Sequence, residues 1–365
     1  MRILQISSAS SFGGGERYVV DLSNALVARG HDLFAALRPN SPLISHLGIP
    51  KSNVKTIPLR NALDPQSARA LAKFVKSEQI DVVHAHMARD YSLAAYAVRR
   101  RPAKFVVTRH VLFPLSRLHS RTLSRATKII AVSGAVAKQL RGQGLVPDDR
   151  IALVHNGIDA ERYSRACDGF DRKLFLTSKN IPADRFLISS IGELRKLKRH
   201  DDFIRAAAIV SEKVTGVHFV IAGVDTSPKG ETKHELIRLA EELNLTDTVS
   251  FLGWLDDADK LLCATDVFVS ASETESFGLS IVEAMATGTT VVATRTEGAQ
   301  EVLENDRTGL LVPIGDVDQL AASIVRLLSD KEQRKSLGGQ AAVTVRESFS
   351  LTRMVDAIEK IYLEA

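Results

Sequence analysis

Cysteines, aromatic residues and long apolar runs are all scarce in this sequence. Of its 365 residues only two are cysteines, Cys167 and Cys263, and 5% are aromatic. So few cysteines argue against a disulfide framework and predict a reducing compartment. No stretch approaches the roughly 18 apolar residues that a membrane-spanning helix needs, and the apolar run after Met1 is too short for a signal peptide. We therefore expect a cytoplasmic protein.

Charge is distributed unevenly along the chain. Residues 1–165 contain 25 Lys and Arg against 11 Asp and Glu, whereas the remainder contains 23 against 32. A basic first half predicts an anionic partner, either a membrane surface or a phosphorylated substrate. Nucleic acid is disfavoured as a partner because no recognition helix or aromatic-rich surface accompanies the charge.

One series of cations stands out within the basic half. Arg117, Arg121 and Arg125 are spaced by four residues and Lys128 follows them, which predicts a basic stripe along one helix face. Such a stripe is either a solvated surface or a surface for peripheral contact with an anionic membrane or a phosphate-bearing acceptor.

Short β-branched runs alternate with amphipathic helical stretches, and no hairpin turns separate them. This order indicates right-handed βαβ units and a doubly wound parallel sheet. The first helix is expected at Arg17–Ala28, with Gly30 just past its end. The expected strands are Ile3–Ser7, Leu33–Leu37, Val82–His86, Phe105–Thr108, Ile129–Val132, Phe186–Ile191, Val217–Ala222, Val249–Leu252, Val267–Ser270 and Thr290–Ala293.

The alternation is interrupted between residues 156 and 181, where the chain is polar and lacks a buried strand. We therefore predict two domains, residues 1–165 and residues 166–349, each with its own sheet. Ligands of open α/β folds bind at the carboxyl ends of the strands, so the cleft is expected there.

A glycine loop, Gly13-Gly14-Gly15, joins the first strand to the first helix. Glycine lets the backbone approach a phosphate and point amide hydrogens at it, next to the positive end of a helix. The loop is not a dinucleotide fingerprint, because Tyr18 stands where the third glycine belongs. A turn required only for tight packing is the alternative interpretation.

A second loop, Gly192–Lys198, follows the strand that ends at Ile191 and carries Arg195, Lys196 and Lys198. Arginine and lysine at the carboxyl end of a strand would bind a diphosphate and neutralise the charge that develops as it leaves. A solvated basic surface is the alternative when this loop is considered alone.

The segment from Glu275 to Glu283 is the most specific feature. A strand is expected to end before it, Glu275 lies in a polar loop, and Ser276 is a competent N-cap for the helix that follows. Glu275 would accept hydrogen bonds from sugar hydroxyls, and the first amides of the helix would face a phosphate. The residues expected to hold the phosphate and the ribose are Ser276, Phe277, Gly278, Leu279 and Glu283.

With these loops in place, the chain resembles family 4 of the retaining glycosyltransferases, whose signature is a pair of glutamates separated by seven residues. Glu275 and Glu283 match that pair, and the resemblance covers nearly the whole chain. It implies the GT-B fold, in which two Rossmann-like domains face a central cleft, with a C-terminal helix at about 350–365 packed on the first domain. Other matching segments are Gly13–Gly15, Thr108-Arg109-His110, Ser133, Asn156–Asp159, Gly192–Lys198 and Glu297–Glu301.

The resemblance also implies roles for single residues. Lys198 and the glycine loop would contact the donor diphosphate, His110 would lie near the donor sugar, and Glu301 near the ribose and phosphate. Relatives have arginine directly after the first glycine of the phosphate loop, where this chain has Glu193, and Arg195 is our candidate replacement. The expected catalytic group is therefore His110, Arg195, Lys198 and Glu275.

Two short motifs have the spacing of metal ligands. His84-Ala85-His86 places two imidazoles on one strand face, but no third ligand is adjacent, and a packing or cleft-lining role is favoured. Asp257-Ala258-Asp259 stands at an expected helix start, where acids suit the helix dipole. We expect no metal site, and the resemblance implies a metal-independent enzyme with no cofactor apart from its UDP-, GDP- or ADP-sugar donor.

These observations predict a retaining transfer of a sugar from a nucleotide-sugar to an acceptor glycan or glycolipid, expected to be a cell-envelope precursor. No covalent nucleophile is evident, so the leaving phosphate is expected to take the acceptor's proton. Three alternatives remain. A nucleotide-sugar epimerase of the same fold would convert the donor alone, a glycosidase would use both glutamates, and a non-catalytic sugar-binding module would keep its affinity without Glu275.

Overall fold

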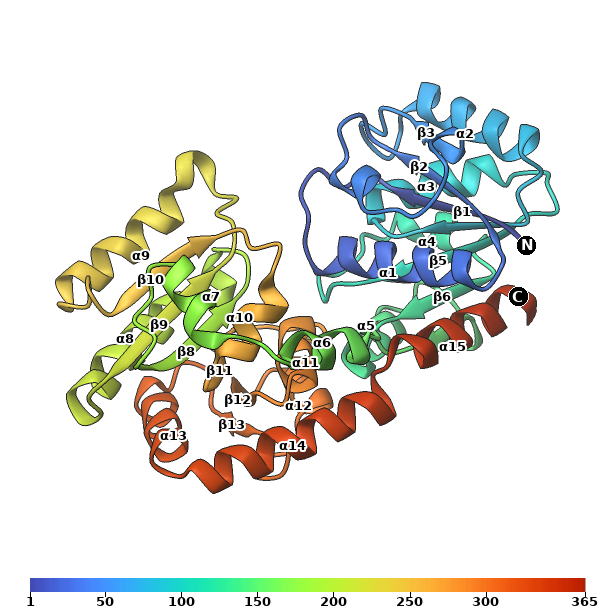
Figure 1. The fold of residues 1–365 in the computed structure, drawn as a ribbon. Coiled ribbons are helices and arrows are strands. Elements are labelled where there is room, and N and C mark those ends of the chain that lie inside the picture. Colours follow the sequence, from blue (N-terminus) through green and yellow to red (C-terminus); the bar gives the residue numbers. More distant parts are fainter. Residues whose placement is uncertain (365) are drawn as a thin grey trace. The chain divides into compact units, whose positions relative to one another are not determined.

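The computed structural model describes residues 1–364, which form two compact units. The N-terminal unit comprises residues 1–157 together with the segment that begins at Leu351, and the C-terminal unit comprises Ile158–Ser350. Each unit has its own parallel sheet covered by helices on both faces (Figure 1).

The boundary between the units lies at residue 157, eight residues before the predicted one. The residues that follow it, Ile158, Ala160 and Tyr163 among them, are buried in a core of the C-terminal unit. The predicted irregular stretch after residue 156 is also partly helical. The prediction relied on the polarity of this stretch, which is polar because its two helices are short and each buries few side chains.

The N-terminal sheet has seven parallel strands in the order β3-β2-β1-β4-β5-β6-β7. Its strands are β1 (Arg2–Ser7), β2 (Asp32–Leu37), β3 (Val54–Thr56), β4 (Val82–Ala85), β5 (Lys104–Arg109), β6 (Lys128–Ala131) and β7 (Ile151–Leu153). Its helices are α1 (Gly14–Ala28), α2 (Pro65–Ser77), α3 (Ala88–Ala97), α4 (His119–Leu123), α5 (Gly134–Gln143) and α15 (Leu351–Glu364).

Two separate cores form because successive residues of a strand point to opposite faces of the sheet. Ile3 of β1 packs with α1 and α15 on one face, whereas its neighbour Leu4 packs with α2 and α3 on the other. These strands are buried on both faces, which is why they appear in the sequence as continuous apolar runs.

The C-terminal sheet has six parallel strands in the order β10-β9-β8-β11-β12-β13. Its strands are β8 (Phe186–Ile191), β9 (Val217–Ala222), β10 (Val249–Gly253), β11 (Val267–Ser270), β12 (Thr290–Thr294) and β13 (Leu310–Val312). Its helices are α6 (Ala160–Cys167), α7 (Arg172–Ser178), α8 (His200–Lys213), α9 (Glu231–Glu242), α10 (Ala258–Ala264), α11 (Leu279–Ala286), α12 (Glu297–Val302), α13 (Val317–Ser329) and α14 (Lys331–Ser348).

All ten predicted strands are present, but three were missed. These are β3, β7 and β13, each three residues long and each at an edge of its sheet. Three residues are too few to show a period in the sequence, and an edge strand gains pairing on one side only. Tertiary pairing with a longer neighbour therefore decides whether such a segment becomes a strand.

The C-terminal helix belongs to the N-terminal unit. Met354, Val355 and Ile358 of α15 pack into the core beside α1, and Figure 1 shows α15, at the red end of the colour scale, close to α1. The buried Tyr362 hydroxyl lies 2.6 Å from Nδ1 of His84 on β4, and His84 Nε2 lies 2.7 Å from the Thr108 hydroxyl. This helix is therefore attached to the sheet by polar as well as apolar contacts.

The two cysteines form a disulfide, contrary to the sequence-based prediction. Cys167 on α6 is bonded to Cys263 on α10, across 96 positions of the sequence. The count of cysteines could not reveal this, because the packing of α6 on α10 is what brings the two together. The cysteine-based argument for a reducing compartment therefore does not hold.

The predicted basic helix face is also wrong. Helix α4 covers only His119–Leu123, so Arg117 and Arg125 lie outside it. Lys128 begins β6, and its Nζ donates a hydrogen bond to the Asp149 carbonyl at 2.7 Å. A spacing of four residues makes a stripe only where the helix is continuous. Within residues 1–364 no helix is both long and apolar enough to cross a membrane.

Reduction of the disulfide is expected to destabilise the protein measurably. Because the bond closes a loop of nearly a hundred residues, the chain-entropy relation predicts a loss of about 4.7 kcal/mol in the free energy of unfolding. Urea titrations with and without dithiothreitol would measure it. The Cys167→Ser/Cys263→Ser variant is the matched control and should not respond to the reductant. Equal stability of the wild type in both conditions, with free thiols detected only after reduction, would contradict the expectation.

Stability should also fall as the pH drops below 6.5. Burial lowers the pKa of His84 to about 3, so the unfolded chain takes up a proton before the folded one does. The contribution of neutral His84 is complete above its unfolded pKa and is lost toward pH 3, at about 1.4 kcal/mol per pH unit. His84→Gln should therefore show a smaller drop in unfolding free energy between pH 7 and pH 5.5. An unchanged pH dependence would contradict this.

Candidate active site

The sheet order of the C-terminal unit determines where its functional loops lie. Strands β8 and β11 are neighbours, and the chain leaves them toward opposite edges of the sheet. Ligands of open α/β sheets bind at such a switch point. The loop Gly192–Lys198 follows β8, and the loop with Glu275 follows β11. A backbone hydrogen bond of 2.8 Å from the Glu273 amide to the Leu197 carbonyl joins the two loops.

Lys198 and Glu275 form an ion pair at this point, with Nζ 2.5 Å from Oε1. The side chains are 26% and 11% exposed, so water screens the pair only in part. The Ser272 hydroxyl donates to the same carboxylate oxygen at 2.7 Å. The Lys198 stem runs along Gly192, where an added Cβ would lie 3.5 Å from it. Within residues 1–364 both bonds reach Oε1, which leaves Oε2 able to accept from a sugar hydroxyl.

The helix after Glu275 begins later than predicted. Helix α11 starts at Leu279, and its N-cap is Gly278, with φ of 91°, in place of Ser276. Ser276 cannot act as the N-cap because the Phe277 side chain is buried in the core, where its ring centroid lies 5.6 Å from that of Phe349. Glycine at position 278 provides the left-handed turn that then starts the helix. The helix predicted from Ser276 would present the amides of Phe277, Gly278 and Leu279 to a phosphate, but only that of Leu279 belongs to the first turn of α11.

The backbone of helix α12 is hydrogen-bonded to the Glu275 loop. The Gly298 amide donates to the Glu275 carbonyl at 3.0 Å, and a Cβ at Gly298 would lie 2.6 Å from that oxygen. No side chain fits there, so glycine is required at position 298 for the close approach of the two backbones. The loop that carries Glu275 is thus fixed by α12 as well as by its own strand.

Glu283 lies one turn into α11 and has a partner that the sequence did not suggest. The Tyr163 hydroxyl on α6 donates to Glu283 Oε1 at 2.7 Å, and Tyr163 is buried. A tyrosine that donates to one carboxylate oxygen holds the carboxylate in one orientation. No local signal could have found Tyr163, because it lies 120 positions from Glu283. Ser272 lies only three residues before Glu275, so a local pattern could have indicated it.

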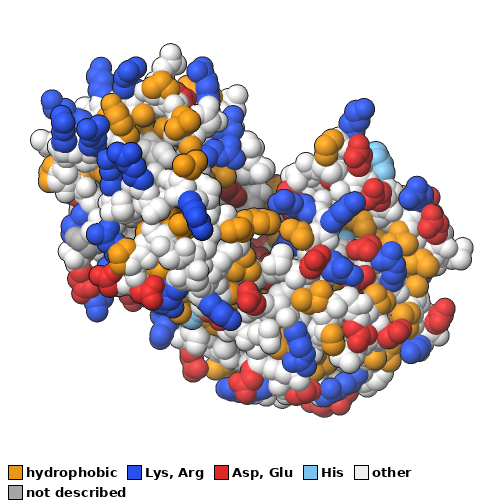
Figure 2. All heavy atoms as spheres, turned by 180° about the vertical axis from the view of Figure 1, so that it is seen from behind, with side chains coloured by type: hydrophobic (Ala, Val, Ile, Leu, Met, Phe, Trp, Pro, Cys, Tyr) orange, Lys and Arg blue, Asp and Glu red, His pale blue; other side chains and the backbone are white. Residues whose placement is uncertain are grey.

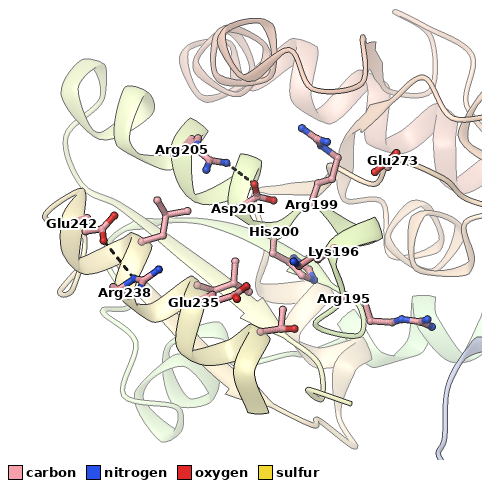
Figure 3. Close-up of a pocket in the computed structure, with 13 residues that line it drawn as sticks. Arg195, Lys196, Arg199, His200, Asp201, Arg205, Glu235, Arg238, Glu242 and Glu273 are labelled. Atoms are coloured by element: carbon pink, nitrogen blue, oxygen red, sulfur yellow. Dashed lines mark hydrogen bonds and ion pairs between the residues drawn. The ribbon is translucent and has the colours of Figure 1, made fainter. Parts of the chain in front are cut away.

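The side chain of Arg195 is not joined to this group, although its backbone carbonyl accepts a hydrogen bond from the Lys198 amide at 2.9 Å. Its guanidinium lies 3.3 Å from Glu193 Oε2 and is about half exposed, and among residues 1–364 it makes no bond to Lys198 or Glu275. It lines a groove of about 500 Å³ between α8 and α9. Figure 3 shows it at one end of that groove, in which Arg205 pairs with Asp201 and Arg238 with Glu242. The groove is therefore a mixed-charge surface, not an anion site.

The N-terminal unit gathers the other predicted residues at its own switch point, between β1 and β4. Helix α1 begins at Gly14, three residues earlier than predicted, so Gly14 and Gly15 lie in its first turn and Gly13 is its N-cap. A Cβ at Gly15 would lie 3.9 Å from Cγ of His110, so the loop and the histidine are in contact. Burial and the nearby Arg109 lower the pKa of His110 to about 3, so its imidazole is neutral.

The two motifs with metal-ligand spacing have other partners. Both ring nitrogens of His84 are hydrogen-bonded, and Nε2 of His86 is 2.7 Å from Gln5 Oε1. Asp257 pairs with Lys179 and Asp259 with Arg162, each at 3.4 Å. These contacts are structural, and in the part of the chain that the structure describes no three His, Cys, Asp or Glu side chains are grouped to bind a metal.

Two family models match the sequence. Residues 12–162 match the model described as Glycosyltransferase Family 4, and residues 171–343 match the model described as Glycosyl transferases group 1. N-acetyl-alpha-D-glucosaminyl L-malate synthase of Bacillus anthracis is 30% identical over 310 residues, which cover 81% of this chain and 78% of that protein. The lipopolysaccharide core biosynthesis glycosyltransferase LpsE of Rhizobium meliloti is 28% identical over 94% of each chain.

Solved structures share the fold over the whole chain. A glycosyltransferase from Rickettsia africae superposes with a TM-score of 0.88 at 23% identity, covering 100% of this chain and 98% of that one. Anabaena HepE in complex with UDP-glucose superposes with a TM-score of 0.86 at 22% identity, covering 100% of both. The chain belongs to glycosyltransferase family 4 and has the GT-B fold.

Proposed function

We propose that this glycosyltransferase moves a sugar from a nucleoside-diphosphate sugar to an acceptor hydroxyl with retention of the anomeric configuration. The observation that carries the proposal is the ion pair of Lys198 and Glu275 at the switch point of the C-terminal unit. A cation and a hydrogen-bond acceptor at that position match the two ends of the donor that change during the reaction, the diphosphate and the sugar.

Lys198 serves the diphosphate. An ammonium has three N–H donors, so Lys198 can keep its bond to Glu275 and still donate to a phosphate oxygen. The amide of Leu279, at the start of α11, supplies further partial positive charge. Arg195 would have to leave Glu193 to join them, and a diphosphate is a stronger attraction for a half-exposed guanidinium than one carboxylate.

Glu275 serves the sugar in this proposal, and His110 keeps the role near the donor sugar that the family resemblance implies. The free Oε2 of Glu275 accepts from a sugar hydroxyl, and Glu283, oriented by Tyr163, accepts from the ribose. The bond from the anomeric carbon to the phosphate oxygen breaks as the acceptor oxygen bonds to the same face, and the leaving phosphate takes the acceptor's proton. An inverted product, detected by NMR of its anomeric proton, would refute this course.

The donor needs no metal ion in this proposal, and no cofactor besides the donor takes part. Lys198 and the α11 amide end supply the positive charge that a metal would otherwise bring to the diphosphate. Uridine is the first base to test. The relative described as UDP-Gal:alpha-D-GlcNAc-diphosphoundecaprenol alpha-1,3-galactosyltransferase of Escherichia coli is 25% identical over 82% of this chain.

The acceptor is proposed to be a cell-envelope glycan or glycolipid bound by the N-terminal unit. That unit carries 25 Lys and Arg against 12 Asp and Glu, and Figure 2 shows its cations gathered on the visible face, at the left. Exposed Phe113 and Leu118 lie beside Arg117 and Arg121 in the sequence. We propose peripheral contact with the inner face of the membrane and a cytoplasmic location, which cell fractionation would test.

Loss of Glu275 should abolish transfer while leaving the fold intact. Glu275→Ala removes the acceptor for the sugar and is expected to lower kcat at least about 100-fold. Lys198→Ala should lower kcat similarly and also weaken UDP binding, because it removes a charge-assisted bond to the diphosphate. Glu273→Ala, an exposed acid two positions before Glu275, is the matched control and should behave as wild type.

The assay should follow the donor with and without acceptor. An epimerase would convert the donor alone at full rate, whereas a transferase would only hydrolyse it slowly. Transfer by Glu275→Ala at the wild-type rate would contradict the proposed role of Glu275. Undiminished sugar binding together with no turnover in the wild type would favour a binding module.

The nucleotide should be identifiable by thermal stability. A ligand at about 100 times its dissociation constant stabilises the folded protein by roughly 2.7 kcal/mol. We expect UDP and its sugars to raise the melting temperature more than GDP or ADP, and EDTA to change neither that shift nor the rate of transfer. A rate lost in EDTA and restored by Mg²⁺ or Mn²⁺ would contradict metal independence.

A further inference from the structure

A buried chain of polar side chains leads from the C-terminal helix to His110. Its members all belong to the N-terminal unit, and all except His110 are at least 95% buried. They come from β1, from β4 and β5 with the residue directly after each, and from α15, so segments far apart in the sequence meet at one point. The chain comprises Tyr362, Gln5, His86, His110 and, on a side branch, His84 and Thr108.

The end next to His110 has a defined hydrogen-bond direction. His86 Nε2 lies 2.7 Å from Gln5 Oε1, and a carbonyl oxygen only accepts, so His86 donates from Nε2. Burial lowers the pKa of His86 well below its usual value, so the ring is neutral and its Nδ1 carries a lone pair. That Nδ1 lies 3.4 Å from His110 Nε2. A hydrogen bond between the two rings then has His110 as its donor, with its proton on Nε2.

The orientation of Gln5 depends on Tyr362. The Gln5 amide lies beside the Tyr362 hydroxyl and opposes the effect of burial, which raises the Tyr362 pKa. The alignment falls short of a full hydrogen bond to Gln5 Nε2. We assign the bond of 2.6 Å between the Tyr362 hydroxyl and His84 Nδ1 with the hydroxyl as its donor, so oxygen lone pairs face Gln5. Lone pairs attract the NH₂ of Gln5 and repel its carbonyl, which therefore points to His86.

We propose that Gln5, oriented by Tyr362 of the C-terminal helix, is a positioning residue that holds His110 in its Nε2–H tautomer through His86. His110 then presents Nδ1 as an acceptor for a hydroxyl of the donor sugar. The inference rests on the proposed function only for the role of His110 toward the sugar. The tautomer itself is a property of the free protein.

The direct measurement is the protonation of the His110 ring in the full-length protein. Long-range ¹H–¹⁵N NMR of histidine-labelled protein at pH 7.5 distinguishes a protonated from an unprotonated ring nitrogen, and loss of the signals in His110→Gln assigns them. We expect protonated Nε2 and unprotonated Nδ1. A wild-type ring protonated on Nδ1 would overturn the proposal without any variant being needed.

Two variants test the positioning. Gln5→Leu removes the acceptor for His86 and should give a mixture of His110 tautomers, and Tyr362→Phe should do so to a smaller extent. Because one buried hydrogen bond changes an equilibrium about two- to tenfold, kcat should fall by a similar factor. The affinity for UDP alone should stay unchanged, since UDP lacks the donor sugar that His110 would contact.

The matched control is Tyr91→Phe. Tyr91 is as buried as Tyr362, and its hydroxyl donates at 2.9 Å to the backbone carbonyl of Thr108, not to the Thr108 hydroxyl that belongs to the side branch. It should lower stability and leave the tautomer and kcat unchanged. A folded Gln5→Leu protein with the wild-type tautomer would overturn the proposal. Absence of any glycosyl transfer by the wild type would instead refute the proposed function and leave the NMR result to decide the tautomer.

Discussion

Both halves of this protein depend on one constraint, a pair of adjacent parallel strands from which the chain continues toward opposite edges of the sheet. In the C-terminal unit β8 and β11 lie side by side although some 75 positions separate them, and the helices that follow pack on opposite faces. Ligands of open α/β sheets bind at the carboxyl ends of such strands, and the two loops follow directly from those ends. Lys198 and Glu275 meet there, and in the N-terminal unit the glycine loop and His110 meet for the same reason.

Partial burial lets the Lys198–Glu275 pair be stable and still accessible to a ligand. A fully exposed pair would contribute little, and a fully buried one would cost more in desolvation than it gained. At 26% and 11% exposure each partner keeps an open side. Supporting bonds from Ser272 and from α12 hold Glu275 in place without occupying its second oxygen, so the geometry exists before any ligand binds.

Sequence reasoning was reliable where a signal is local and repeated. Buried parallel strands are continuous apolar runs, and all ten that were predicted exist because each buries both faces. It failed where a distant partner decides the outcome. Ser276 was a competent N-cap in isolation, but burial of Phe277 against Phe349 moved the helix start to Leu279. The cations near Arg121 had the spacing of a helix face, but α4 is too short to carry them.

The sequence by itself determined the fold class, the family and the loops that carry the chemistry, because glycines, cations and carboxylates stand directly after apolar runs. Only the tertiary structure decided which of those side chains meet. In the folded protein Lys198 forms an ion pair with Glu275, and Arg195 forms one with Glu193. Tyr163 donates a hydrogen bond to Glu283, and Cys167 forms a disulfide with Cys263. Such pairings span up to 120 positions of the chain, and their partners are set by the packing of helices on sheets, which no local pattern records.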